Sequence, residues 1–219
     1  MASGLDDVAV DGSGSSDAIA VDGDGPAKPD QLTKSQAARR SRVIRAAIEL
    51  AAEGGYEAVQ MRDVAARGRV ALGTIYRYFT SKDHLLAAAQ VEWVTDLEHR
   101  VGQRPPRGET TADRMVEILR RATRAMEREP ALTAALVTAM SSPDPGVAEC
   151  QREMGLVMGR IQANAFPERF DPDMQQRIVD AIEFIWFSSL LAWANGWVGI
   201  NDAGERLASA AHLLLDQYD

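Results

Sequence analysis

Residues 55–86 read GYEAVQMRDVAARGRVALGTIYRYFTSKDHLL, and this stretch decides the fold of the first part of the chain. The Gly-Gly pair at 54–55 predicts the end of a preceding helix, because glycine is unfavourable inside helices. Residues 61–67 predict a second, short helix, Gly68 predicts a tight turn, and the apolar residues within 70–75 predict a third helix. Two short helices around a turn form a helix-turn-helix, whose second helix normally enters the major groove of DNA.

The third helix of this stretch carries side chains that suit DNA. Thr74, Tyr76, Arg77 and Tyr78 can donate hydrogen bonds to phosphates or to base edges. Phe79 follows directly, and we expect its ring to fill the core between the three helices. The sequence therefore predicts a three-helix, DNA-binding head.

The charge of the chain is distributed unevenly along its length. The net charge is -8, yet residues 33–82 hold ten Lys/Arg against four Asp/Glu. The flanking residues 1–32 and 83–219 are both acidic. A basic segment in an acidic protein is the expected footprint of DNA binding, because cationic side chains neutralise phosphates. The alternative is a solvated helix face, but here the basic segment coincides with the helix-turn-helix.

Composition indicates where the protein works. The chain has 219 residues and a single cysteine, Cys150, which excludes an internal disulfide and suits a reducing compartment. No apolar run reaches the roughly 20 residues of a membrane span, and the acidic N-terminus does not resemble a signal peptide. We predict a cytoplasmic protein with no membrane partner.

Helical periodicity predicts an all-α fold with three parts. Residues 1–32, rich in Asp, Gly, Ser and Ala, predict a disordered acidic leader. Residues 33–81 predict the helix-turn-helix head. Residues 82–219 predict a helical domain for ligand binding and dimerisation. Its first helix is too long for the head alone, so it can transmit movement between the two domains.

A pair of apolar helices near the C-terminus predicts a homodimer. Residues 172–198 are apolar nearly all round, so both sides of that helix must be covered. Residues 202–217 carry a second apolar stripe, and two such helices from each of two chains make a four-helix interface. A single thick core is the alternative.

Methionines and aromatic residues at helical spacing predict an adaptable apolar cavity in the second domain. Such stripes are also typical of an ordinary core. The candidate lining residues are Trp93, Leu97, Met115, Leu119, Met126, Met140, Met154, Met158, Phe184, Phe187 and Trp193.

The segment RDVAARGRVALGTIYRYFTSKDHLL, residues 62–86, resembles the TetR family of one-component bacterial repressors. The resemblance extends over residues 36–217 in helix order. It implies an all-helical homodimer that binds an inverted-repeat operator as double-stranded DNA and leaves it when a small ligand binds the second domain. The predicted DNA-contacting residues are Arg62, Arg69, Thr74, Tyr76, Arg77, Tyr78 and Lys82.

Two positions depart from the family pattern. Gln60 stands where Ser or Thr usually caps the second helix, and Ala71 stands where Ser is common before the recognition helix. Gln60 is a poorer cap than Ser or Thr. Ala71 removes one expected phosphate hydrogen bond.

A narrower resemblance is to actinobacterial repressors of cholesterol (steroid) catabolism, on residues 69–93 and on IEFIWFSSLLAWANGW, residues 182–197. It implies a steroid, or its coenzyme A thioester, as inducer. An arginine cluster within 120–128 then offers partners for the thioester phosphates, or else pairs with neighbouring glutamates. Alternatives are a regulator without an inducer, and one that responds to a fatty acyl-CoA or a drug-like compound.

Enzyme activity is not predicted. His84, His99 and Cys150 show neither the spacing of a metal site nor a catalytic signature. We expect His84 to lie on the surface or to face a phosphate, and we predict no catalytic residue, no metal and no cofactor.

Overall fold

The computed structural model describes residues 31–218, and within that range it contains helices and no strand. The all-α prediction is confirmed. The predicted acidic leader falls almost entirely on residues 1–30, which lie outside the described residues.

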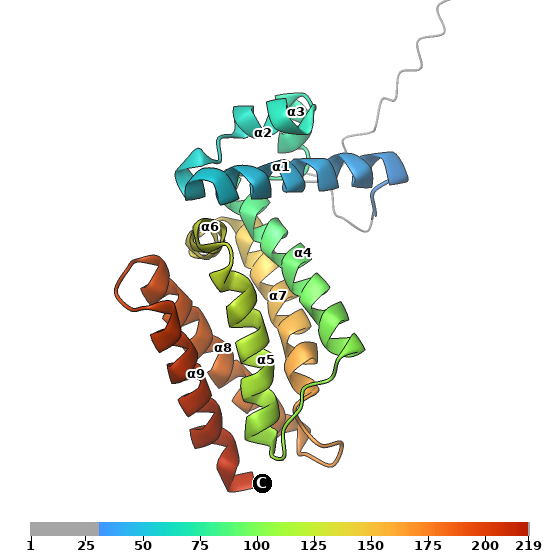
Figure 1. Ribbon diagram of the computed structural model, residues 1–219. Helices are drawn as coiled ribbons and strands as arrows, with labels where there is room; N and C mark the ends of the chain where they lie inside the picture. The colour runs from blue at the N-terminus through green and yellow to red at the C-terminus, as the bar shows by residue number, and fades with distance from the viewer. Residues whose placement is uncertain (1–30, 219) are drawn as a thin grey trace, which may run out of the picture.

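The head consists of three helices, with α1 (Lys34–Ala58) crossing the molecule and α2 (Met61–Gly68) and α3 (Leu72–Tyr76) on its outer side (Figure 1). Thr33 starts α1 with a capping box, accepting a hydrogen bond from the Gln36 backbone while the Gln36 side chain accepts one from the Thr33 backbone. The regular helix breaks at 54–55, as predicted, because Gly55 has a φ of 70°.

The turn of the helix-turn-helix differs from the prediction at one residue. Gly68 remains in α2, and the left-handed residue is Arg69, with φ 51° and ψ 50°. A Cβ atom at Gly68 would lie 3.6 Å from the backbone oxygen of Arg42 in α1. That distance is an ordinary van der Waals contact, so the turn depends on the left-handed backbone of Arg69 and not on Gly68.

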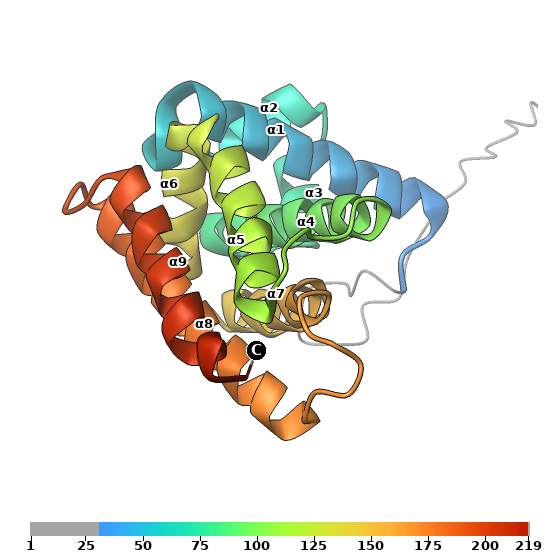
Figure 2. The same ribbon diagram turned by 60° about the horizontal axis from the view of Figure 1, so that its bottom comes forward.

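Six helices form the second domain (Figures 1 and 2). They are α4 (Lys82–Gln103), α5 (Thr111–Glu127), α6 (Pro130–Met140), α7 (Pro145–Ala163), α8 (Pro172–Ala194) and α9 (Ile200–Leu215), and a short 3-10 turn, η2 (Asp216–Tyr218), follows. The short α6 packs beneath α1, while α4 packs along α7, and α9 packs against α5 and α8. Helix α8 ends earlier than predicted, because Gly196 takes a φ of 73°.

The core crosses the boundary between the two domains. Phe79 is fully buried, as predicted, and it shares one cluster with Leu85 and Leu86 of α4 and Leu136 of α6. A second cluster lies farther along α4, between α5, α7, α8 and α9. Because α4 contributes to both clusters, a displacement of α4 moves the base of the head.

Candidate DNA-binding face and ligand cavity

The outer side of α2 and α3 presents most of the predicted DNA contacts. Arg62, Arg69 and Arg77 are exposed, and Thr74 is half-buried. Tyr76 is 51 % exposed, which leaves about half of its surface accessible to a partner. This side of the molecule faces away from the second domain (Figure 1), so a duplex can approach it without obstruction from this chain.

Two of the predicted contacts lie elsewhere. Tyr78 is buried, with its ring edge-on to Phe79 at 6.3 Å between centroids. Lys82 is half-buried: its Nζ lies 3.6 Å from the centroid of the Tyr56 ring and donates to the Tyr56 backbone oxygen at 3.3 Å. The sequence pattern did not show the contact of Lys82 with Tyr56, because it depends on how α1 meets α4.

The junction of the head with the second domain is polar. Thr80 donates from its backbone N–H to Nδ1 of His84 at 3.1 Å and from its hydroxyl to Asp144. Asp144 also accepts from the Gly146 N–H at 2.7 Å, at the start of α7. His84 is buried, and this burial lowers its pKa. The expectation of a surface histidine was wrong, because the α6–α7 turn covers it.

An ion pair joins α1 to α4 beside this junction. Arg40 contacts the Glu92 carboxylate at 2.9 Å, and its guanidinium lies over the Phe79 ring, 5.3 Å from the centroid. Burial raises the pKa of Glu92 above its usual range, and Arg40 opposes that rise. The head is thus tied to α4 by charge as well as by apolar contact.

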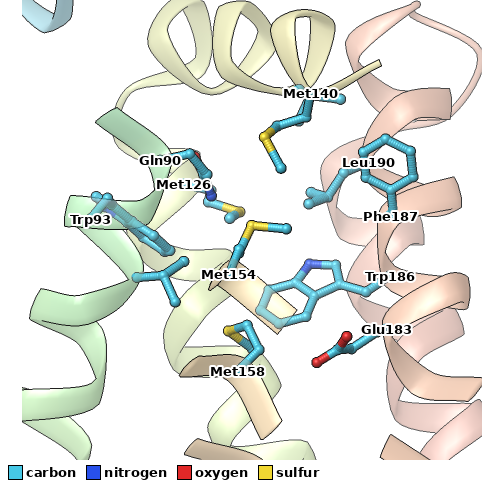
Figure 3. Close-up of a pocket in the computed structure, with 12 residues that line it drawn as sticks. Gln90, Trp93, Met126, Met140, Met154, Met158, Glu183, Trp186, Phe187 and Leu190 are labelled. Atoms are coloured by element: carbon cyan, nitrogen blue, oxygen red, sulfur yellow. The ribbon is translucent and has the colours of Figure 1, made fainter. Parts of the chain in front are cut away.

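A cavity of about 70 Å³ lies between α4, α5, α6, α7 and α8. Six predicted residues line it: Trp93, Met126, Met140, Met154, Met158 and Phe187. Figure 3 shows four methionine side chains from three different helices pointing into the same space. Thioethers are flexible, so the walls of this cavity can adapt to an occupant.

Five predicted residues do not reach the cavity. Met115 is fully buried in the lower core, and Phe184 is 78 % exposed on the outer side of α8. Leu97 and Leu119 line separate surface grooves, and Trp193 is half-buried one turn beyond the cavity. Helical spacing identifies an apolar face but does not distinguish a core from a cavity wall.

The cavity also has lining residues that the sequence analysis missed, among them the polar side chains of Gln90 on α4 and Glu183 on α8. Glu183, Trp186 and Leu190 are lining residues of α8, and their spacing of three and four places them on one face of the helix. Burial raises the pKa of Glu183 to about 7, with a smaller contribution from Asp180. The spacing of Glu183, Trp186 and Leu190 was visible in the sequence, and it could have identified this face of α8 as a cavity wall.

Two polar atoms beside this cavity lack hydrogen-bond partners within residues 31–218. They are Nε1 of Trp186, which is 6 % exposed, and Oε1 of Gln162, which is fully buried. The other end of the Gln162 amide donates to Glu183 at 3.5 Å, across from α7 to α8.

A groove of about 610 Å³ between α4 and α5 is lined by five arginines. They are Arg100, Arg104, Arg121, Arg124 and Arg128, and no carboxylate is among the lining residues. Arg121 is held by Glu117 at 3.0 Å, whereas the other four make no ion pair within the described part of the chain. Glu117 therefore pairs with only one of the five arginines that line the groove.

Some lining residues of the groove lie close in sequence to lining residues of the cavity on both helices. Leu97 of the groove comes one turn after Val94 of the cavity on α4, and Ala125 precedes Met126 on α5.

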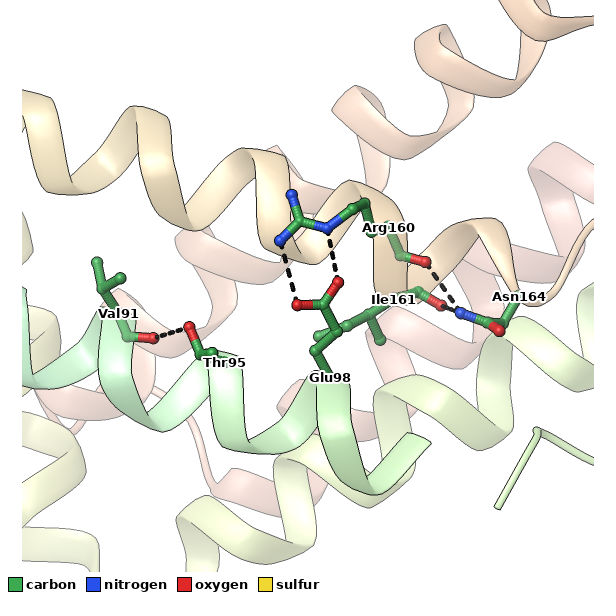
Figure 4. Close-up of polar contacts among 6 residues, drawn as sticks. All are labelled: Val91, Thr95, Glu98, Arg160, Ile161 and Asn164. Carbon is green, nitrogen blue, oxygen red and sulfur yellow. Dashed lines mark hydrogen bonds and ion pairs between the residues drawn. The ribbon is translucent and has the colours of Figure 1, made fainter. Parts of the chain in front are cut away.

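The outer half of α4 is clamped to α7. Arg160 donates to both oxygens of Glu98, at 2.6 and 3.1 Å, which lowers the pKa of that carboxyl (Figure 4). Bidentate geometry of this kind fixes orientation as well as distance. Helix α4 is thus connected to α1 at one end and to α7 at the other.

The side of α8 and α9 exposes apolar residues. Phe184 is 78 %, Trp197 is 74 % and Leu213 is 80 % exposed. No helix among residues 31–218 is long and apolar enough to cross a membrane. In the same residues, no three metal-binding side chains gather at one point.

Comparison with known proteins identifies the family. Residues 43–89 match the model for bacterial regulatory proteins of the tetR family, and residues 108–214 match the tetracyclin repressor-like C-terminal domain. The chain is 39 % identical over 186 residues to the HTH-type transcriptional repressor KstR of Rhodococcus jostii, covering 85 % of this chain and 87 % of that one. It is 34 % identical to KstR of Mycobacterium tuberculosis, covering 85 % of each chain.

Solved structures agree with this result. A TetR transcriptional regulator from Rhodococcus sp. RHA1 superposes with a TM-score of 0.76 at 31 % identity, covering 85 % of this chain and all of that one. The FadR repressor of Thermus thermophilus has a TM-score of 0.63 at 22 % identity, covering 80 % of this chain and 92 % of that one, and supports the fold alone. The chain belongs to the TetR family, and it is a transcriptional repressor rather than an enzyme.

Proposed function

We propose that the protein is a homodimeric repressor that leaves an inverted-repeat operator when a bulky apolar ligand, such as a steroid coenzyme A thioester, occupies the cavity between α4 and α8. It would act in the cytoplasm and control genes of steroid or lipid catabolism. The observation that carries this proposal is that α4 lines the cavity and also forms the base of the head. The narrower resemblance and the KstR relatives support the steroid class.

The size of the cavity supports release by ligand. Sites for drug-sized ligands occupy ~300–1,000 Å³, whereas this cavity measures about 70 Å³. A bulky ligand enters only if the methionine side chains and at least one wall move. Because Trp93 and Val94 of α4 form one wall, entry displaces the helix that carries the head. A ligand shifts the equilibrium between DNA-bound and released protein only if it binds these two states with different affinities. The displacement of α4 would supply that difference in affinity.

The arginine groove supports a ligand with an anionic head. Guanidinium groups bind phosphates in bidentate fashion, and coenzyme A carries several phosphates. Four arginines without ion pairs in the described residues repel one another until an anion is bound. The phosphates of a fatty acyl-CoA would bind the same arginines. The shape of the apolar cavity therefore decides between steroid and fatty acyl thioesters.

Exposed apolar residues support the dimer. Phe184, Trp197 and Leu213 would be covered by the same surface of a second chain in a two-fold arrangement. One recognition helix reads only a few base pairs, so two copies at a fixed spacing give useful specificity.

The decisive experiment measures operator binding by fluorescence anisotropy on DNA from upstream of the gene itself. Each titration is repeated with a steroid acid coenzyme A thioester, the free steroid acid, oleoyl-CoA and coenzyme A alone. We expect the steroid thioester to release the DNA at the lowest concentration. Release by oleoyl-CoA alone would reassign the ligand class, and unchanged binding with all four compounds would contradict ligand control.

A further inference from the structure

The side-chain amide of Gln90 is a buried polar group in the wall of the cavity. Gln90 is 8 % exposed and lines the cavity from α4, together with Trp93 and Val94. Within residues 31–218 its amide forms no hydrogen bond, and protein atoms do not enclose it as they enclose Nε1 of Trp186. Buried polar groups in folded proteins nearly always have a partner, so we expect an occupant of the cavity to supply one.

Gln90 differs from the other polar groups of the cavity in what it can bind. A primary amide donates from Nε2 and accepts at Oε1, whereas the indole of Trp186 can only donate. The carboxyl group of Glu183 already receives a hydrogen bond from Nε2 of Gln162, at 3.5 Å. The other lining side chains are methionine, aromatic and aliphatic. Gln90 therefore offers a ligand both a donor and an acceptor that no protein group has taken.

Gln90 lies on the stretch of α4 between the two core clusters. Leu86, one turn earlier, belongs to the cluster that holds Phe79 at the base of the head, and Val94, one turn later, belongs to the cluster around the cavity. Residues four apart lie on the same face of a helix. Figure 3 shows Gln90 on the α4 wall, across the cavity from Trp186 of α8. A ligand bonded to Gln90 thus contacts the helix whose displacement the proposed function requires.

We propose that Gln90 is a specificity-determining residue of the cavity, and that its amide hydrogen bonds an uncharged oxygen group, a ketone or a hydroxyl, on the apolar part of the ligand. This inference rests on the proposed function and specifies a feature of the ligand apart from its thioester. A ketone accepts from Nε2, and a hydroxyl accepts from Nε2 or donates to Oε1. An amide supplies no countercharge, so a charged group here would be desolvated without compensation.

The test uses three ring compounds of similar size, cyclohexanone, cyclohexanol and cyclohexene, of which only the first two carry an oxygen. The full chain is labelled with 15N at its glutamine side chains, and the Gln90 signals are those missing from the Gln90→Met variant. We expect cyclohexanone and cyclohexanol to move the Gln90 Nε2–H signals to lower field, because a hydrogen bond forms. Cyclohexene should not produce this shift. The dissociation constants come from the same titrations.

The Gln90→Met variant keeps the volume and flexibility of the side chain and removes the amide. Its melting temperature without ligand should equal or exceed that of the wild type, because an apolar group replaces an unpaired buried amide. Its affinity for cyclohexanone should fall about tenfold relative to its affinity for cyclohexene, the loss expected for one hydrogen bond. Met154→Leu, a substitution of similar volume in the same cavity, is the matched control and should leave that relative affinity unchanged.

A destabilised or unfolded Gln90→Met chain would show that the amide has a partner within the protein, and it would overturn the proposal. An unchanged relative affinity, equal effects of the three compounds on the Gln90 signals, or no binding by any of them would do the same. The test needs no DNA, so the two proposals fail separately. DNA release by the thioester without an effect at Gln90 removes the role of Gln90 alone. An effect at Gln90 without DNA release removes the ligand-controlled function and leaves the binding preference as a property of the cavity.

Discussion

The hydroxyl of Thr80 lies 2.9 and 3.0 Å from the two carboxylate oxygens of Asp144, which joins the last residues before α4 to the N-cap of α7. Burial alone would raise the pKa of Asp144, but hydrogen bonds from Ser81, Gly146 and Thr80 lower it, so the carboxylate remains ionised at neutral pH. The contact connects the base of the head to the domain that holds the cavity.

We expect Thr80→Val to weaken the coupling between ligand and DNA without unfolding the chain. The substitution removes the hydroxyl and should lower the free energy of unfolding by about 1 kcal/mol. The ratio of operator affinities with and without the steroid thioester should fall severalfold. Thr138→Val is the matched control, since the Thr138 hydroxyl bonds only to Ala134 within its own helix. An unchanged ratio in Thr80→Val would exclude this contact from the coupling.

Tyr76→Ala should reduce operator affinity by about tenfold with the fold and dimer intact, because the ring is exposed on the DNA-facing side. Tyr218→Ala, an exposed tyrosine in η2, is the control.

Lys82→Ala should reduce the slope of log operator affinity against log salt concentration by about one unit if Lys82 leaves Tyr56 to bind a phosphate. A melting-temperature loss with an unchanged salt slope would instead show a purely internal role.

The double substitution Arg124→Glu and Arg128→Glu should weaken thioester binding by at least tenfold and leave the free steroid acid less affected. The two arginines line the groove without ion pairs in the described residues, so charge reversal replaces attraction to phosphate with repulsion. Arg152→Glu, an exposed residue of α7, controls for the change in net charge. Calorimetry with both ligands measures the difference, and equal losses for both would contradict a phosphate subsite.

Glu183→Gln should stabilise the chain progressively as the pH rises from about 4.5 to about 7. The folded pKa of Glu183 is about 7 against an ordinary value of 4.5, so the wild-type protein loses stability as the carboxyl ionises within that window. Glutamine does not titrate, and below pH 4.5 the two proteins should melt alike. We expect a difference of a few degrees in melting temperature at pH 8. A constant difference across the window would show that Glu183 is not responsible.

Phe184→Glu and Leu213→Glu should each convert the dimer to a monomer. Both side chains are more than three-quarters exposed in the single chain, on α8 and α9, so a charge there would be buried unpaired in the proposed interface. Leu156→Glu on α7 is the control, since Leu156 is 69 % exposed but lies outside those two helices. Sedimentation equilibrium distinguishes the states. A dimer that survives both substitutions would place the interface elsewhere.

Local chemistry in the sequence was sufficient to predict the helices and the helix-turn-helix. The Ser81 cap of α4, the glycines at 54–55 and the apolar spacing around Phe79 act over a few residues, so their effects are visible without a fold. The basic segment at 33–82 coincides with the head, and its contact with DNA stays a prediction.

Tertiary structure alone decided which side chains meet. Met115 and Met126 share one apolar stripe of α5, yet only Met126 reaches the cavity, because the approach of α7 and α8 determines where the core closes. Lys82 turned inward to Tyr56, and His84 was covered by the α6–α7 turn. Helical periodicity defines the direction of a side chain on its own helix, whereas burial, pKa and partners depend on neighbours that arrive from distant parts of the chain.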